Sequence, residues 1–302
     1  TRPHAANQVT YSPWHARALA SVVFAIEQVN NQSDGHFDHL LPNTTIVYEY
    51  YDYYSGNGDG DLEIARFAAD IKYRAFGGEG ADVILGAGSS SKSITLQSIA
   101  KYFSLPQVSG FASSGRLSND KDFPFFLRTV PTDKILANAM VEFAKRKLGC
   151  ESAAIIHGDD SYSQYGAADI VAAAKRHDMD ILCKSAFQTR APEEMDLGQV
   201  ALSGANVFIF FGQETSIVPF LRALYTALLP TQLLRTGFVI IFPDVYLGTN
   251  VELAFQQANE SHIYEAMCNG TFALSQQRSG EFTPTFNAVF KERLKSLWEC
   301  TN

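Results

Sequence analysis

The sequence predicts an α/β protein of two lobes, each built on a doubly wound parallel sheet. Short apolar segments such as 206–211 alternate with longer amphipathic segments of helical length. Strands that are apolar throughout and separated by helices are typical of a parallel sheet covered on both faces. The chain has 302 residues, which is enough to bury two cores of ordinary size.

The first lobe is predicted over residues 1–130. Its helices are expected at 15–30, 61–76 and 90–103, and its strands at 45–53, 81–87, 106–110 and 125–130. Helix 15–30 carries its apolar residues on one stripe, whereas 45–53 is rich in β-branched and aromatic residues. We expect Asp61 to cap the second of these helices.

The second lobe is predicted over residues 131–268, after a break near Pro131. Its helices are expected at 133–148, with Asp133 as the cap, and at 164–177, 192–202 and 215–229. Its strands are expected at 152–157, 180–187, 206–211 and 238–242, and a strand-like segment at 267–273 ends the series. Residues 269–302 are predicted to return toward the first lobe and to include a helix at 284–298.

Composition excludes some classes of function. A net charge of −8 argues against a nucleic-acid partner, because no basic stripe can displace counterions. No apolar run approaches the ~18–20 residues that span a bilayer. The first residues contain no signal-peptide core, so either the chain is cytosolic or a signal was removed. Four acceptor motifs for N-glycosylation favour an extracellular chain, at Asn31, Asn43, Asn259 and Asn269.

Cys150 and Cys183 lie near the starts of two consecutive predicted strands. If those strands are adjacent, the two cysteines could form a disulfide; two free thiols are the alternative.

The sequence contains no recognisable catalytic, metal or cofactor motif. A phosphate loop, a GxGxxG turn, an HExxH helix, a CxxC pair and a GxSxG elbow are all missing. Ser161 and Tyr162 lie near His157, but no third group completes a catalytic set. We therefore expect a protein that is not an enzyme and that needs no metal or cofactor.

The strongest candidate site is the turn at Ser89, Ser90 and Ser91, which follows strand 81–87 and opens helix 90–103. Free N–H groups at a helix start favour a carboxylate or a phosphate. The same residues are also ordinary helix caps. Ser113 after the next strand, Tyr162 in the second lobe and Asp244 after strand 238–242 also follow carboxyl ends of strands, where α/β folds bind ligands.

Several segments of this sequence are similar to those of a known family. The chain resembles the ligand-binding domain of class C G-protein-coupled receptors, especially metabotropic glutamate receptors. The segments that carry this resemblance are 23–31, 40–43, 88–91, 105–107, 112–114, 126–133 and 160–166. The resemblance implies a Venus-flytrap module, related to type I periplasmic binding proteins and to natriuretic-peptide-receptor ectodomains.

For the ligand, the resemblance implies a small amino acid or a relative, bound between the lobes and signalling by lobe closure. The α-carboxylate would contact Ser90 and Ser91, and the α-amino group would contact Ser113, the Ala112 carbonyl and Asp244. Tyr162 would close onto the ligand from the second lobe. Trp14 and Asp133 match further positions of the family's site.

The chain also departs from the family. Ala18 stands where glutamate receptors have the arginine that holds the side-chain carboxylate, so the ligand's side chain is not specified. The family's first strand and last elements are not in this sequence, which predicts a truncated domain with Cys300 lacking its usual partner. The resemblance implies an extracellular or secreted location, a homodimer through lobe 1, and membrane contact only through regions outside this chain.

Two other classes of function stay open. One is a natriuretic-peptide-receptor-like ectodomain that binds a peptide or serves in dimerisation. The other is an α/β enzyme without a recognisable catalytic set.

Overall fold

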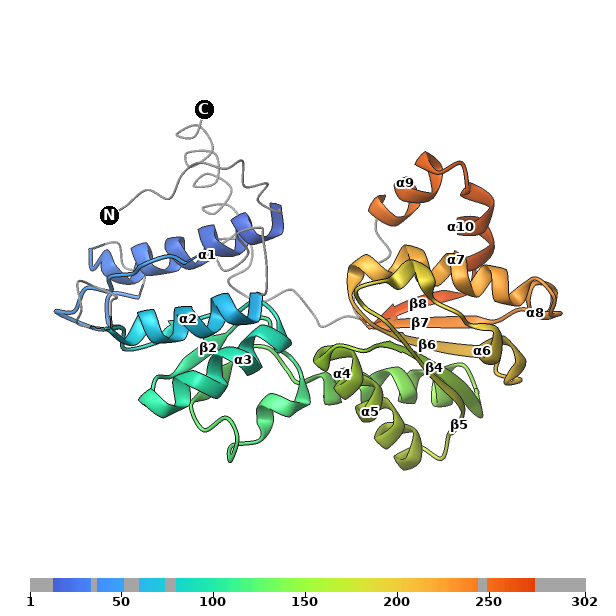
Figure 1. Ribbon diagram of the computed structural model, residues 1–302, viewed down its shortest axis with the longest axis horizontal. Helices are drawn as coiled ribbons and strands as arrows, with labels where there is room; N and C mark the ends of the chain where they lie inside the picture. Colours follow the sequence, from blue (N-terminus) through green and yellow to red (C-terminus); the bar gives the residue numbers. More distant parts are fainter. Residues whose placement is uncertain (1–12, 34–36, 52–59, 74–79, 244–248, 275–302) are drawn as a thin grey trace. The chain divides into compact units, whose positions relative to one another are not determined.

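The computed structural model describes residues 13–33, 37–51, 60–73, 80–243 and 249–274 (Figure 1). The chain divides into two compact units, residues 1–63 with 277–302 and residues 64–276. Helix α1 (Pro13–Asn30) belongs to the first unit, and helix α2 (Gly60–Tyr73) begins at the boundary. The second unit contains both sheets. Among the described residues, no helix combines the length and the apolar character needed to cross a membrane.

The first sheet has three short parallel strands in the order β1-β2-β3. They are β1 (Ile84–Leu85), β2 (Gln107–Ser109) and β3 (Phe126–Arg128). Helix α3 (Ser90–Ala100) follows β1 and continues as a 3-10 turn at Lys101–Phe103. A second 3-10 turn, Gly115–Ser118, follows β2. Both flanking strands expose a leucine, since Leu85 and Leu127 keep 54% and 58% of their surface.

The second sheet has five parallel strands in the order β5-β4-β6-β7-β8. The strands are β4 (Ser152–Gly158), β5 (Asp180–Phe187), β6 (Val207–Phe211), β7 (Val239–Pro243) and β8 (Thr271–Leu274). The series starts at β4, adds β5 on one side, and then continues from the other side of β4. This reversal is the doubly wound topology that the sequence predicts, and it is confirmed.

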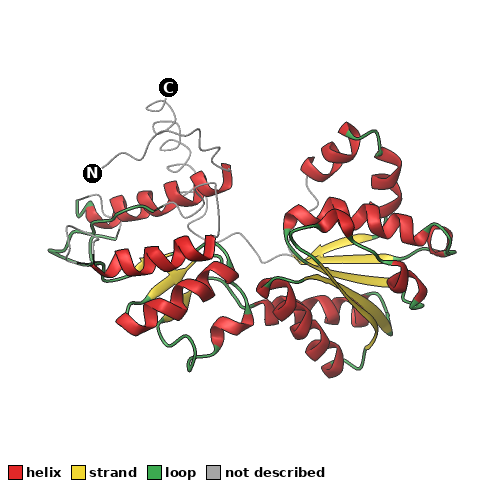
Figure 2. Ribbon diagram, viewed as in Figure 1, coloured by secondary structure: helices red, strands yellow, loops and turns green. Residues whose placement is uncertain are grey.

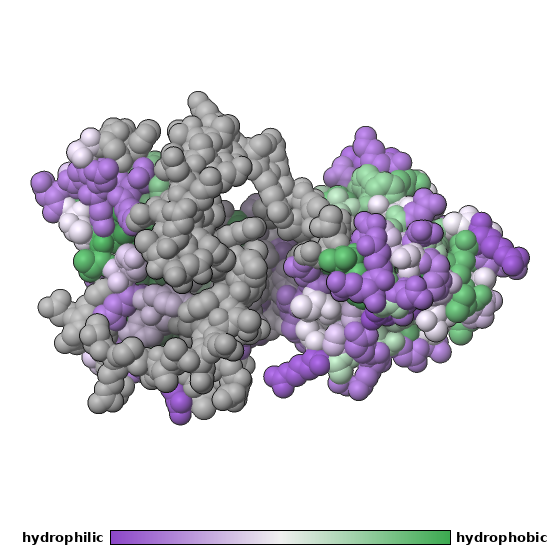
Figure 3. Space-filling model, turned by 90° about the horizontal axis from the view of Figure 1, so that it is seen from above, coloured by the Kyte–Doolittle hydropathy of each residue, from purple (hydrophilic) through white to green (hydrophobic). Residues whose placement is uncertain are grey.

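Helices cover both faces of this sheet (Figure 2). One face carries α4 (Asp133–Glu142), which ends in a π turn at Phe143–Lys147, and α5 (Ser161–Arg176). The other face carries α6 (Gly198–Leu202), α7 (Ile217–Leu228), α9 (Thr249–Gln257) and α10 (Ser261–Cys268). Seen from the side of α9 and α10, this part of the surface is mostly hydrophilic with separate apolar patches (Figure 3).

Strand β6 lies at the centre of the core, and all five of its residues are buried. Phe208 and Phe210 pack toward α7, whereas Ile209 and Phe211 pack toward α4 and α5. Each such side chain contributes about 1.5–3 kcal/mol when it leaves water. The apolar run at 206–211 is therefore the segment on which both layers of helices depend.

Most predicted helices and strands of the second lobe are confirmed, with shifted ends. Helix α5 starts at Ser161 instead of 164, because the Asp160 side chain accepts hydrogen bonds from the N–H groups of the first turn. The helix expected at 192–202 is divided into a 3-10 turn, Pro192–Glu194, and α6. The helix expected at 215–229 starts with a 3-10 turn, Glu214–Ser216, before α7.

Helices α8 (Leu233–Thr236), α9 and α10 were not predicted from the sequence. Helix α10 extends to Cys268, so the strand-like segment 267–273 is a strand only from Thr271. Strand β8 pairs with β7, although it lies inside the predicted return segment 269–302. The helix expected at 284–298 lies outside the described residues.

Two expectations for the first lobe are wrong over the described residues. Residues 45–51 form no strand, because no described strand pairs with them and Val47 and Tyr48 are exposed. The Asn30 side chain instead holds the backbone of Ile46, donating to its carbonyl at 2.9 Å and accepting from its N–H at 2.7 Å. Strand 81–87 is reduced to Ile84–Leu85.

The predicted lobe boundaries at residues 130 and 268 remain a prediction. The two sheets do separate near the first of them, since β3 ends at Arg128 and α4 begins at Asp133. The two compact units, however, divide near residues 63 and 277.

The candidate disulfide is not formed, and Cys150 and Cys183 are free thiols. Cys183 packs against the core on the α7 face of the second sheet, whereas Cys150 packs against the core on the α4 face. Their strands are adjacent as expected, but the two side chains lie on opposite faces of the sheet.

We expect Gly166→Ala to destabilise the second unit. A Cβ atom at Gly166 would lie 2.0 Å from Cε1 of the buried Phe211 ring, so α5 or the ring must move. Overpacking of this kind costs about 1–3 kcal/mol. Urea denaturation measures the loss, with Gly110→Ala as the control, because its Cβ would meet only Thr129 Oγ1 at 3.7 Å. Equal stability of the two variants would contradict the packing argument.

Candidate functional site

The serine turn has the geometry of a capped helix start. Ser89 is the N-cap of α3, and its Oγ accepts a hydrogen bond from the Lys92 N–H at 3.4 Å. The Oγ atoms of Ser89 and Ser91 lie 3.4 Å apart. Gly86, at φ +124°, lets the chain bend sharply after β1. The turn therefore brings the start of α3 to the carboxyl end of β1, as the sequence predicts.

Ser90 connects this turn to the loop after β2. Its side chain is buried, and its Oγ accepts a hydrogen bond from the Ser114 N–H at 3.1 Å. Two further buried serines hold the backbone just before the turn. Ser93 and Ser109 both donate to the Ala87 carbonyl, at 3.2 and 2.8 Å. The structure thus brings together Ser90 and the loop of Ala112 and Ser113, two parts of the predicted site.

Arg128 holds the loop after β2 in place. Its guanidinium donates to the carbonyls of Ala112 at 3.3 Å and Ser114 at 2.9 Å, and it also contacts Ser118 Oγ. The Ala112 carbonyl, predicted to accept from a ligand's amino group, therefore already has one donor. A carbonyl oxygen has two lone pairs, so one acceptor position remains.

Asp133 lies behind this loop at the first turn of α4. Thr132, not Asp133, is the N-cap residue, so the predicted capping role is wrong. The Asp133 N–H donates to the Ser113 carbonyl at 2.9 Å, and the Ser113 hydroxyl bonds to the Asp133 carboxylate. This carboxylate is 3% exposed, and its Oδ2 has no hydrogen-bond partner among the described residues.

The environment of Asp133 favours its neutral form. Burial raises its pKa to about 7, the Ser113 hydroxyl lowers it, the negative charge of Asp169 raises it, and Arg128 lowers it. Asp169, on α5, also has a buried Oδ2 without a partner in the described part of the chain. Two carboxylates and one guanidinium thus meet where the loop after β2 approaches α4 and α5.

Tyr162 lies in the first turn of α5 and packs into the second unit. Its ring centroid is 4.9 Å from that of Phe211, and its N–H donates to Asp160 Oδ1 at 3.0 Å. The next tyrosine, Tyr165, has the Arg116 guanidinium over its ring at 5.9 Å. The contact between the loop after β2 and α5 therefore involves Tyr165, which the sequence analysis did not select.

A polar cluster at the switch point of the second sheet was also not predicted from the sequence. Gln213, after β6, donates to Asp160 Oδ1 at 3.3 Å, and Thr189, after β5, donates to Asp160 Oδ2 at 3.3 Å. Doubly wound sheets bind ligands where the strand order reverses. The signal in the sequence was a polar residue two positions after the end of each of three strands, β4, β5 and β6.

Two predicted site residues cannot be placed. Asp244 lies outside the described residues, and so does the side chain of Trp14 in α1. The four predicted glycosylation residues, in contrast, are all described and exposed: Asn31, Asn43, Asn259 and Asn269.

We expect Asp133→Asn to remove a pH dependence of stability. The folded protein binds the Asp133 proton more tightly than the unfolded chain does, so this group stabilises the fold below about pH 4 and ceases to do so as pH rises through about 7. The variant should be more stable than the wild type by about 2–4 kcal/mol at pH 8 and show little gain at pH 4.

Urea unfolding at several pH values measures this difference, with Asp120→Asn at an exposed position as the control. A stability difference that does not change with pH would contradict the assignment.

Comparison with known proteins identifies the family. Residues 17–270 match the ANF receptor family, described as the receptor family ligand binding region. Taste receptor type 1 member 3 of Canis lupus familiaris is 30% identical over 178 residues, which cover 55% of this chain and 20% of that receptor.

The extracellular calcium-sensing receptor of Mus musculus is 26% identical over 236 residues, which cover 74% of this chain and 21% of that receptor. Metabotropic glutamate receptor 6 of Oryctolagus cuniculus is 28% identical over 188 residues, covering 60% and 22%. The chain spans about a fifth of the length of these relatives.

The family match covers most of the chain, and the fold is the α/β arrangement that the sequence predicts. The chain therefore belongs to the receptor family ligand binding region, as a ligand-binding domain of the class C G-protein-coupled receptor type.

Proposed function

We propose that this chain binds a small amino acid or a close relative through the serine turn and the loop after β2. The observation that carries the proposal is the hydrogen bond from the Ser114 N–H to Ser90 Oγ, which joins these two segments. Strands β1 and β2 are adjacent and parallel, so both segments follow carboxyl ends at the same sheet edge.

The two sides of this site have complementary chemistry. The start of α3 and the hydroxyls of Ser90 and Ser91 suit an α-carboxylate. Ser113 and the second lone pair of the Ala112 carbonyl suit an α-ammonium group, whose positive charge would favour the ionised form of the nearby Asp133. An amino acid presents both groups on one carbon atom.

By resemblance, Tyr162, Asp244 and Trp14 complete this site, and ligand binding drives lobe closure in a receptor homodimer joined through lobe 1. A ligand shifts such an equilibrium only by its difference in affinity for the two states. The exposed acceptor asparagines support an extracellular location. The relatives are receptors, which supports a protein that is not an enzyme.

One observation supports a second candidate, a peptide-binding or dimerising ectodomain. Ser90 Oγ and the Ala112 carbonyl already have partners within the chain. If these bonds are their whole role, the serine turn is a structural connection and no amino acid binds there.

We expect Ser90→Ala and Ser113→Ala each to weaken amino-acid binding about tenfold or more, because hydrogen bonds to charged groups contribute about 1.5–3 kcal/mol. Isothermal titration calorimetry of the full chain with a panel of amino acids measures the affinities. Ser98→Ala is the matched control on the same helix, since Ser98 Oγ only donates to the Ile94 carbonyl. Circular dichroism shows that each variant is folded.

If no amino acid binds the folded protein, or if both site variants bind as the wild type does, the second candidate is favoured. Chemical conversion of any amino acid would instead show an enzyme.

A further inference from the structure

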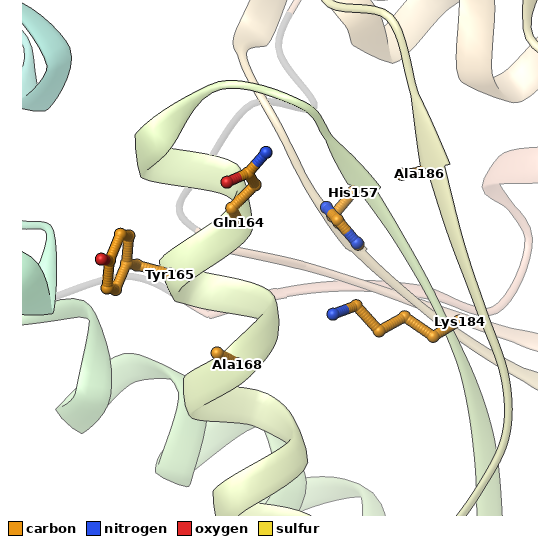
Figure 4. A pocket seen from close by; sticks show the side chains of 6 residues that line it. All are labelled: His157, Gln164, Tyr165, Ala168, Lys184 and Ala186. Carbon is orange, nitrogen blue, oxygen red and sulfur yellow. The ribbon is translucent and has the colours of Figure 1, made fainter.

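A hollow of about 550 Å³ lies between α5 and the outer part of the second sheet (Figure 4). It is separate from the serine turn, because all of its lining residues belong to β4, β5 and α5. They are His157, Gln164, Tyr165, Ala168, Lys184 and Ala186.

Local packing explains why this space is open. Ala168 on α5 and Ala186 on β5 both end at Cβ, so neither side chain fills the gap between helix and sheet. The residue beside Ala186 in register is His157 on β4, whose side chain lies against the sheet with 5% of its surface exposed. The hollow is thus lined by two alanines, one on α5 and one on β5, and by the buried imidazole on β4.

A bulge in β5 turns Lys184 toward this hollow. The register shifts between Ala153 and Ala154, whose partners are Ile181 and Cys183, so Leu182 is an extra residue. Ile181 packs on the α5 face of the sheet. With strict alternation Lys184 would lie on the opposite face, whereas in the structure it lines the hollow on the same face as Ile181. Bulges of this kind often redirect a functional side chain.

Lys184 is an exposed side chain at the rim of the hollow. Its ammonium group points into the space between the sheet and α5 (Figure 4), and it has no ion pair or hydrogen bond within the described part of the chain. The carboxylates near His157, those of Asp159 and Asp160, already accept hydrogen bonds from other groups. Asp159 accepts from the Thr189 N–H and hydroxyl at 2.9 and 2.7 Å, and Asp160 caps α5.

His157 presents a second polar atom. Its Nδ1 lies 2.7 Å from the Gly158 carbonyl, and because a carbonyl only accepts, Nδ1 carries a hydrogen. Nε2 is therefore an acceptor in the neutral ring and a donor in the protonated ring. Gln164 donates through Nε2 to the Asp159 carbonyl at 2.7 Å, which leaves its carbonyl oxygen as a further polar atom.

We propose that this hollow binds a small carboxylate anion, with Lys184 as its ion-pair partner and the protonated His157 as a hydrogen-bond donor. An ammonium and an imidazolium that face one open depression of the surface can both bind an oxyanion, the first by its charge and the second by a charge-assisted hydrogen bond. The site goes beyond the amino-acid site proposed above and uses none of its residues.

Binding at this site takes up a proton. In the free protein, burial lowers the pKa of His157; the Gly158 carbonyl, Asp159 and Asp160 raise it, and Lys184 lowers it. From α5 the titratable neighbour is Tyr165, and the residue beside His157 on β6 is the uncharged Phe211. A bound anion raises the pKa of His157, so affinity increases as pH falls, by up to about tenfold per pH unit for one linked proton.

The test is isothermal titration calorimetry of the full chain with sodium succinate and with sodium acetate at pH 6 and pH 8, at constant ionic strength. Inorganic phosphate, in a parallel titration, shows whether the site prefers carboxylates to other oxyanions. We expect carboxylate binding that is tighter at pH 6 and at least as tight as phosphate binding. Lys184→Gln should weaken it about tenfold, the usual effect of losing a charge-assisted hydrogen bond.

Two variants distinguish this site from general charge effects. Lys175→Gln removes the same charge from the exposed last turn of α5, outside the hollow, and should leave binding unchanged. Ala168→Leu keeps the charge and the helix propensity but fills the hollow, and should abolish binding.

Two results would overturn the proposal. One is that no carboxylate binds at about 10 mM, and the other is that Lys184→Gln and Ala168→Leu bind carboxylates with the affinity of the wild type. Lys184→Gln should bind amino acids at the serine turn as the wild type does, so failure of the amino-acid site and failure of this site are distinguishable.

Discussion

The whole second unit depends on β6, which needs cover on both faces at once. A strand of five buried residues can be stable only between two layers of helices. This requirement fixes α7 on one face and α4 and α5 on the other, and it brings the carboxyl ends of β4, β5 and β6 to one edge. Asp160, Gln213 and Thr189 meet there because the core brings their strands together.

Apolar patterning was sufficient to predict the second sheet. Strand 180–187 coincides with β5, and the segments of β4, β6 and β7 were found to within one or two residues. The same reasoning failed at 45–51, because strand composition cannot form a ladder without a neighbouring strand. It also failed at Cys150 and Cys183, since a sequence predicts which strands are adjacent more reliably than which face each side chain occupies.

The candidate site was predicted in part. Ser90 and Ser113 were predicted because each is a small polar residue that follows a predicted strand. The pattern of apolar residues predicts both the start of α3 and the order of the parallel strands. What the sequence could not show is how these residues are already used. Arg128 stands 14 residues beyond Ser114, yet it fixes the Ala112 and Ser114 carbonyls, and Asp133 is a buried carboxylate instead of a cap. Such long-range contacts depend on tertiary packing.

The bulge in β5 also bears on the solubility of the protein. β5 is an edge strand of eight residues, and a long regular edge offers unpaired N–H and carbonyl groups to any other chain. The extra residue at Leu182 breaks that regular spacing, and a lysine two positions later adds charge where a second strand would dock. Proteins avoid edge-to-edge aggregation by such irregularities. The distortion that turns Lys184 toward α5 thus makes this edge a poor template for amyloid-like growth.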